Sequence, residues 1–231
     1  MKKKIAIVTK KMILGGIEKA LLSMLSEINK DKYDITLFLE EKGGELEESI
    51  PSWVKVEYIF DDCKYIRENI VISLKKFKIR DAIKFIYSGI RIYILKDEYK
   101  IYKDRCSILS KRKEKYDIAI SYHNPINLST IYVIDKLNAD KKVMWIHTDI
   151  NKNDKNFNYL EKYYYKYDKV FAVSPGGYKA FIDKYPDLKN KTEVFLNRIV
   201  KSEIIRKIDN KNYYDAFEGI KLLTVGRICY P

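Results

Sequence analysis

The amino-terminal stretch of the chain changes from one hydrophobic pattern to another at a pair of glycines. Residues 4–9 are apolar or β-branched after the leading lysine, which is typical of a buried strand. Behind Gly15 and Gly16 the apolar side chains recur every three or four positions, at Ile17, Ala20, Leu21, Met24, Leu25 and Ile28. That spacing places them on one side of a helix. The pattern therefore predicts a strand, a short Gly-Gly loop and an amphipathic helix.

Short apolar runs and helical stripes alternate along much of the remaining chain. We expect further strands at residues 33–39, 54–59, 116–122, 142–147, 169–174 and 193–197, and helices near residues 126–137, 157–167, 176–184 and 202–208. Several strands are unbroken apolar runs, as in sheets that are covered on both faces. The alternation predicts an α/β fold, a Rossmann-like parallel sheet with helices on both faces.

The segment 61–115 departs from this alternation. It is too long for a surface loop and mixes apolar with basic residues, so we expect two or more helices inserted between strands. The chain has a net charge of +13, and eight of these charges fall within residues 61–116, which hold sixteen Lys or Arg and eight Asp or Glu. Such helices would suit an anionic membrane surface, or they cover the sheet with their lysines facing water. The two interpretations are compatible.

The composition limits the cellular compartment and the kinds of binding site that we expect for this protein. The three cysteines are far apart and form no C-x-x-C pair, so neither a disulfide framework nor a zinc site is indicated. The apolar run after the first lysines is too short for a signal peptide, and no stretch approaches the roughly 20 apolar residues of a membrane span. We expect a cytoplasmic protein, peripheral at the inner face of the plasma membrane. We expect no metal site, no cofactor and no nucleic-acid partner.

Polar residues follow several of the expected strands, where open α/β sheets bind ligands. Gly15 and Gly16 leave backbone N–H groups at a helix start, which can hold a phosphate or a sugar hydroxyl. His147 follows a buried strand and has a side chain that titrates near neutral pH, although a strand-end histidine can also only cap the next helix. His123 and Ser174 end other strands, and Asp149 either orients His147 or begins a turn.

Four short motifs occur in an order that resembles one enzyme family. They are Gly-Gly-Ile-Glu after the first strand, Trp145-Ile146-His147-Thr148-Asp149, Val194-Phe195-Leu196-Asn197, and Leu223-Thr224-Val225-Gly226-Arg227. Together they resemble the N-terminal half of retaining GT-B glycosyltransferases of family 4, which build bacterial surface glycans such as capsules and teichoic acids.

This resemblance implies roles for individual residues. His147 would be catalytic beside the donor sugar, and Gly15, Gly16 and Arg227 would bind the donor, a nucleotide sugar of the UDP type. His123, Asp149 and Ser174 would contact a lipid-linked or glycan acceptor. No divalent metal would be required.

The resemblance also divides the chain. Residues 1–208 would form the acceptor-side domain, residues 209–219 a linker, and residues 220–231 the first strand of a truncated donor-binding domain. The lysine and glutamates that such enzymes use for the donor do not follow Arg227, so we expect the chain to be inactive alone. The alternative is a non-catalytic acceptor- or membrane-binding module, or a truncated gene product.

Overall fold

The structure is a computed structural model of the 231-residue chain. It describes residues 2–60, 66–75, 77, 79–95, 102–103, 105–107, 109–124, 128–147, 150, 161–198, 218–220 and 222. The chain divides into two compact units, residues 1–199 and 200–231. The expected helix at 202–208 and most of the linker and of the last strand lie outside the described residues, as do Asp149 and Arg227.

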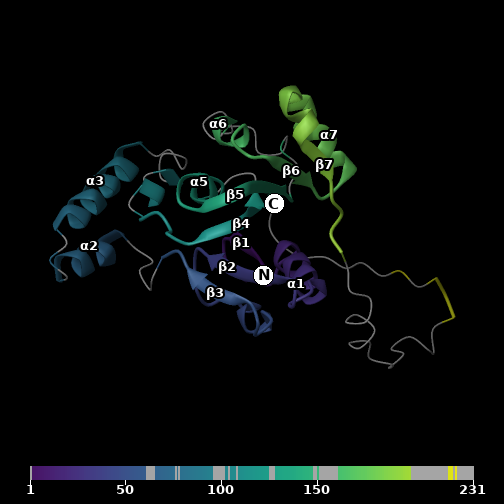
Figure 1. Ribbon diagram of the computed structural model, residues 1–231, viewed down its shortest axis with the longest axis horizontal. Helices are drawn as coiled ribbons and strands as arrows, with labels where there is room; N and C mark the ends of the chain where they lie inside the picture. The colour runs from purple at the N-terminus through teal and green to yellow at the C-terminus, as the bar shows by residue number, and fades with distance from the viewer. Residues whose placement is uncertain are drawn as a thin grey trace. The chain divides into compact units, whose positions relative to one another are not determined.

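A seven-stranded, fully parallel sheet forms the centre of the first unit (Figure 1). Its order is β3-β2-β1-β4-β5-β6-β7. The strands are β1 (Lys3–Thr9), β2 (Tyr33–Leu39), β3 (Lys55–Tyr58), β4 (Lys115–Asn124), β5 (Asn138–Ile146), β6 (Lys169–Ala172) and β7 (Thr192–Val194). The sequence-based prediction of a Rossmann-like α/β sheet is confirmed.

Most differences from the expected elements lie at their ends. Strand β5 begins at Asn138, four residues before the expected start, because its polar first half also pairs with β4. Strands β6 and β7 end earlier than expected, at Ala172 and Val194. Helix α6 is described over Glu161–Tyr164 and is followed by a turn, so it ends before the expected residue 167, while residues 157–160 lie outside the described part of the chain. Polarity alone does not show where backbone pairing stops.

Helices cover both faces of the sheet, as the unbroken apolar strands require. Helix α1 (Gly16–Glu27) packs on one face, where Ile5 and Ile7 of β1 meet Leu21 and Leu25. Helices α5 (Leu128–Asp135), α6 and α7 (Pro175–Lys184) supply residues to the core on the opposite face, which includes Ala6. Because side chains alternate along β1, one strand serves both cores.

Helices occur in the segment between β3 and β4, as expected, and two of them have described bounds. They are α2 (Ile66–Lys75) and α3 (Ile79–Leu95), and they pack against each other. After them the chain returns to the main core through Cys106, whose side chain is buried. Among the described residues, no helix is long and apolar enough to cross a bilayer.

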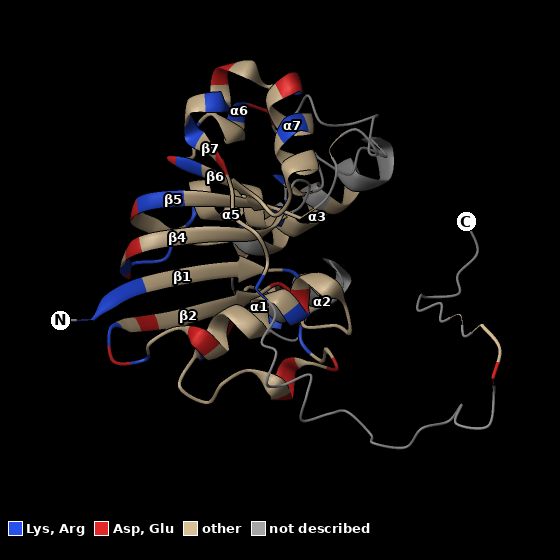
Figure 2. Ribbon diagram, turned by 90° about the vertical axis from the view of Figure 1, so that its right-hand side faces the viewer, with Lys and Arg blue, Asp and Glu red and all other residues tan. Residues whose placement is uncertain are grey.

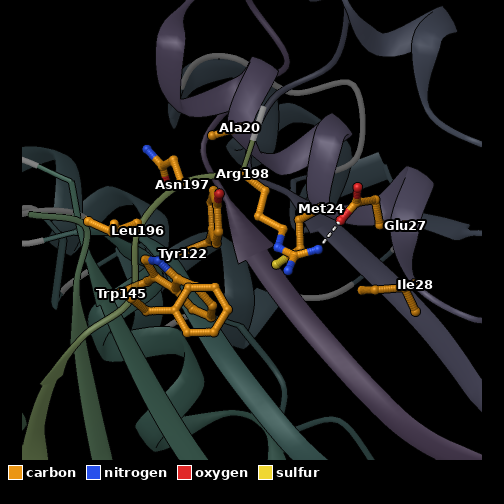
Figure 3. A pocket seen from close by; sticks show the side chains of 10 residues that line it. Ala20, Met24, Glu27, Ile28, Tyr122, Trp145, Leu196, Asn197 and Arg198 are labelled. Carbon is orange, nitrogen blue, oxygen red and sulfur yellow. Dashed lines mark hydrogen bonds and ion pairs between the residues drawn. The ribbon is translucent and has the colours of Figure 1, made fainter. Parts of the chain in front are cut away.

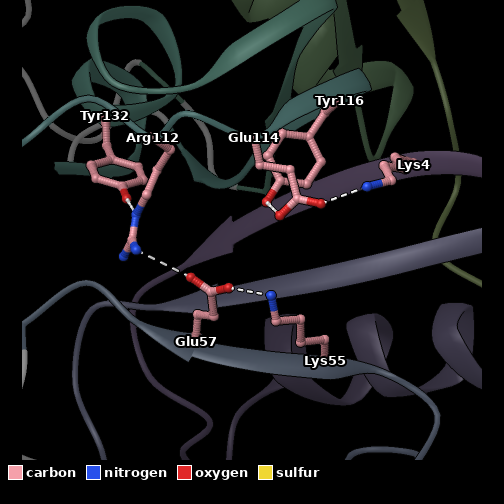
Figure 4. Close-up of polar contacts among 7 residues, drawn as sticks. All are labelled: Lys4, Lys55, Glu57, Arg112, Glu114, Tyr116 and Tyr132. Atoms are coloured by element: carbon pink, nitrogen blue, oxygen red, sulfur yellow. Dashed lines mark hydrogen bonds and ion pairs between the residues drawn. The ribbon is translucent and has the colours of Figure 1, made fainter.

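Charged side chains gather at the amino ends of the strands, whereas the carboxyl ends carry few (Figure 2). Lys4 Nζ lies 2.7 Å from Glu114 Oε1, and Lys115 Nζ lies 2.8 Å from Asp140 Oδ1. Nearby, Arg112 donates from Nε to the Tyr132 hydroxyl at 2.9 Å and pairs with Glu57 (Figure 4). These contacts fix the chain where it leaves the inserted segment and enters β4.

Candidate functional site at the carboxyl edge of the sheet

The order of the strands reverses between β1 and β4. From β1 the chain proceeds through β2 to β3 on one side, and it then returns to place β4 on the other side. The connections that follow β1 and β4 therefore diverge, and open α/β sheets bind ligands at the carboxyl ends of strands at such a switch point. Gly15 and Gly16 follow β1, and His123 lies near the end of β4. The structure thus brings three of the sequence-predicted residues to one switch point.

The start of helix α1 is the first component of this site. Gly15 is the N-cap residue in an extended conformation, and it has no side chain that could cap the helix. A Cβ on Gly16 would meet no atom within 4 Å, so the space beside this residue is open. Backbone N–H groups at a helix start carry a partial positive charge. This end of α1 can accept an anion that approaches the backbone closely.

Glu18 is the residue at this site that sequence reasoning missed. Its side chain is only 3% exposed and folds back over Gly15, where a Cβ would overlap its carboxylate. Burial raises its pKa, while a hydrogen bond from its own backbone N–H opposes that rise. Its Oε1 lies 3.9 Å from Nδ1 of His123. The sequence signal was available, since Glu18 belongs to the Gly-Gly-Ile-Glu motif.

His123 lies at an irregularity of β4. The register against β5 shifts between Ser121 and Asn124, so β4 holds one extra residue there. Such bulges redirect side chains at sheet edges. Burial, and secondarily Lys10, lowers the pKa of His123. The imidazole is therefore neutral at pH 7.

His147 directly follows β5, the strand beside β4. Its ring centroid lies 4.5 Å from that of Tyr122, and its Nε2 is buried without a hydrogen-bond partner among the described residues. Burial, and secondarily His123, lowers the pKa of His147 to about 4. A neutral imidazole with a free nitrogen can hydrogen-bond a hydroxyl group without adding charge to the site. The catalytic role expected for His147 stays a prediction.

Ser174 has a structural role that the sequence left open. It is the N-cap of α7, and its Oγ accepts a hydrogen bond from the backbone N–H of Gly177 at 3.0 Å. It follows β6 at the same edge of the sheet as the histidines. Its side chain is exposed, so the expected acceptor contact stays a prediction.

The loop between β1 and α1 is braced by a second glycine pair, which sequence reasoning also missed. A Cβ on Gly44 would overlap the backbone carbonyl group of Met12. The Met12 carbonyl oxygen accepts a hydrogen bond from the backbone N–H of Leu46 at 2.8 Å. Glu45 Oε2 accepts another from the backbone N–H of Leu14 at 3.1 Å. The position of the loop that precedes Gly15 therefore depends on the segment after β2.

A buried carboxyl group stands at the end of β2. Glu40 is 2% exposed, and burial raises its pKa to about 7 against the opposing influence of Arg105 and Lys10. It also forms a hydrogen bond with the backbone of Ser129, in the first turn of α5. Near neutral pH this group changes charge inside the fold.

A pocket of about 170 Å³ lies between α1 and the chain that follows β7 (Figure 3). Aromatic rings of Tyr122, Trp145 and Phe195 form part of its wall, and the Trp145 and Phe195 ring centroids are 4.9 Å apart. Arg198 reaches to α1, where its Nη1 lies 2.7 Å from Glu27 Oε2. The sequence did not predict this pocket, and none of the sequence-predicted site residues lines it.

Within the described ranges, no three His, Cys, Asp or Glu side chains are grouped so that they could hold a metal ion. The described site therefore offers helix N–H groups, two neutral imidazoles and the two buried carboxyl groups of Glu18 and Glu40. These can bind phosphate oxygens and hydroxyl groups.

No protein-family model and no curated protein matches the chain. Among solved structures it is similar to Anabaena Alr3699/HepE in complex with UDP and glucose, at 15% identity and a TM-score of 0.48 over 88% of this chain and 48% of that one. It is similar to a glycosyltransferase from Rickettsia africae, at 16% identity and a TM-score of 0.47 over 89% of this chain and 48% of that one. A third is the apo form of the lipopolysaccharide outer core galactosyltransferase WaaB, at 14% identity and a TM-score of 0.45 over 85% of this chain and 46% of that one.

The chain thus spans about half the length of these structures. Identities and TM-scores of this size are too low for the likeness to bear on function.

Proposed function

We propose that this chain is the acceptor-side domain of a retaining, nucleotide-sugar-dependent glycosyltransferase of the GT-B type, family 4, that makes bacterial surface glycan. Its donor would be a UDP-sugar, its acceptor a lipid-linked or free glycan, and no metal would be required. The protein would work at the inner face of the plasma membrane. One observation carries the proposal: at the switch point, the start of α1 follows β1, His123 lies near the end of the neighbouring strand β4, and His147 directly follows β5.

The helix start supports the donor part of the proposal. A diphosphate that leaves a sugar gains negative charge, and oriented N–H groups stabilise that charge without having to reorganise. The open space at Gly16 lets phosphate oxygens approach the backbone. Glu18, whose pKa is raised by burial, folds back over Gly15 beside this helix start. Arg227, which follows the Leu-Thr-Val-Gly motif, would supply a guanidinium group to the same phosphates.

The histidines support the sugar part of the proposal. His147 is neutral and has an unpaired ring nitrogen among the described residues, so it can orient a hydroxyl group of the donor sugar. His123, Asp149 and Ser174 would serve the acceptor. The aromatic pocket beside α1 offers ring faces of the kind that pack against the C–H faces of sugars. The chain by itself is expected to bind without transferring sugar.

The two histidines make the proposal directly testable, because the chain contains no others. We would titrate the isotope-labelled chain with UDP and follow the imidazole and backbone signals by NMR. We expect both histidines and the backbone N–H groups of Gly16 and Ile17 to shift together with one dissociation constant.

Gly16→Ala should weaken UDP binding by about 10-fold, because the added methyl group separates the phosphate from the backbone. Gly176→Ala is the matched control, since a Cβ on this glycine at the start of α7 also meets no atom within 4 Å. It should bind UDP as the parent does. Saturating shifts that spare both histidines, or equal weakening by the two variants, would overturn the proposed site.

A further inference from the structure

The pair of helices α2 and α3 exposes an unusual amount of apolar surface. On α3 the exposed apolar residues fall at Ile79, Ile83, Ile86 and Ile90, spacings of three and four that form one continuous stripe. Ala82 is buried, so α3 has an inner side as well. Among the residues that the structure describes, no segment covers this second, exposed apolar stripe of α3.

The turn between the helices adds a second, independent anomaly. Phe77 is 90% exposed and has a positive φ of 53°. Its backbone N–H donates to the carbonyl oxygen of Leu74 at 3.0 Å, so it occupies the left-handed position that ends a helix. Glycine is the usual residue there, because a side chain is strained in this conformation. Phe77 is thus unfavourable for folding in two ways, by strain and by exposure.

The surrounding charge indicates what covers this surface. Lys75 and Arg80, the described basic residues that flank the turn, are both exposed. Residues 61–116 as a whole carry a surplus of eight positive charges. A protein interface would favour fewer charges around its apolar centre, whereas an anionic bilayer offers apolar chains below a negative surface.

We propose that Phe77 and the exposed stripe of α3 insert into the interfacial layer of an anionic lipid bilayer, with Lys75 and Arg80 among the headgroups. This membrane contact would hold the carboxyl edge of the sheet near a membrane-linked acceptor, and only this purpose rests on the proposed function. The binding itself needs neither nucleotide nor sugar.

The test is flotation of the full chain with vesicles, in the absence of nucleotide. Vesicles of phosphatidylcholine alone are compared with vesicles that contain about 30% phosphatidylglycerol, at about 0.1 M and about 0.5 M salt. We expect binding to the anionic vesicles that falls at high salt. Lys75→Glu with Arg80→Glu should abolish it, whereas Lys30→Glu with Lys32→Glu, an equal charge change at exposed sites after α1, should leave most of it.

Phe77→Gly is the decisive variant. It should lower the vesicle partition coefficient about 10-fold, because one aromatic ring no longer leaves water. It should also leave thermal stability unchanged or raised, because glycine relieves the backbone strain at this position. Ile13→Ser, at an exposed apolar residue outside the helix pair, should not change binding.

A Phe77→Gly variant that binds vesicles as the parent does would overturn the inference. So would equal binding to neutral and anionic vesicles, or a stable dimer in solution with no vesicle binding, which would assign the stripe to a second copy of the chain. None of these results would touch UDP binding, which is measured without vesicles. The failure of one proposal is therefore distinguishable from the failure of the other.

Discussion

Replacing Gly44 by alanine tests whether the loop before α1 is braced as the structure shows. The new methyl group would overlap the backbone carbonyl oxygen of Met12, whereas Cβ atoms in proteins essentially never approach another heavy atom within 3.0 Å. Met12 is fully buried, so its carbonyl cannot retreat toward solvent. We expect the segment after β2 and the loop after β1 to separate, and the hydrogen bond from Leu46 to Met12 to break.

The size of the effect follows from two contributions. Forcing a methyl group into a packed site costs about 1–3 kcal/mol. Losing one backbone hydrogen bond in a partly buried loop costs about 1 kcal/mol more. Gly44→Ala should therefore lower the free energy of unfolding by about 2–4 kcal/mol. Gly16→Ala makes the same chemical change in open space at the start of a helix, where alanine is favoured by up to about 1 kcal/mol, so it should leave stability unchanged or raised.

Urea unfolding of the two variants and the parent, followed by circular dichroism, measures the difference. Opposite signs for the two glycines would support the brace. If Gly44→Ala is as stable as the parent, the loop does not depend on this close approach, and the position assigned to Gly15 and Gly16 loses its support.

Two further predictions concern buried titratable groups. Burial raises the pKa of Glu40 from 4.5 to about 7, so the stability that its protonated form provides is present below pH 4.5 and is lost as pH rises through 7. The free energy of unfolding of Glu40→Gln should therefore rise relative to that of the parent by up to about 3 kcal/mol between pH 4.5 and pH 8. A constant difference between the two proteins across that range, measured by urea unfolding, would refute this. Burial lowers the pKa of His147 to about 4, so the free energy of unfolding of the parent should fall as pH falls from 6.5 to 4. In His147→Gln this fall should be smaller by up to about 3 kcal/mol. If the unfolding free energies of the two proteins change with pH in parallel, the imidazole is not buried as the structure shows.

The fold was predictable because its signal repeats along the chain. Most strands contain several closely spaced apolar or β-branched residues, as β2 does, and the predicted and observed bounds of β2 are the same. Strand order could not be read from such runs, because β1 and β4 are equally apolar and pair only in the folded sheet. The polar start of β5 was missed for a related reason: its pairing with β4 depends on backbone groups that are the same in every residue.

The candidate site was predictable only in its outline. A residue that follows a strand must lie at the carboxyl edge of a parallel sheet, which is why Gly16, His123 and His147 could be placed there. Contacts between segments were beyond reach, because no local pattern shows that Gly44 lies against Met12 or that Glu18 folds back toward His123. The position of Ser174 after a strand is compatible both with a contact to a ligand and with capping of the next helix, and the structure shows the capping.

The distribution of charge along the chain separates the proposed binding of a diphosphate from the proposed binding of a membrane. The described carboxyl edge offers dipoles and neutral rings, since burial keeps His123 and His147 uncharged and raises the pKa of Glu18. A surplus of eight charges instead lies in the segment of α2 and α3 and the residues around them. Dipoles act over short distances and select an anion by its fit, whereas a net charge attracts any anionic surface. A protein that had to bind a diphosphate while resting on an anionic bilayer would benefit from this separation, because a strongly basic site would itself be drawn to the headgroups.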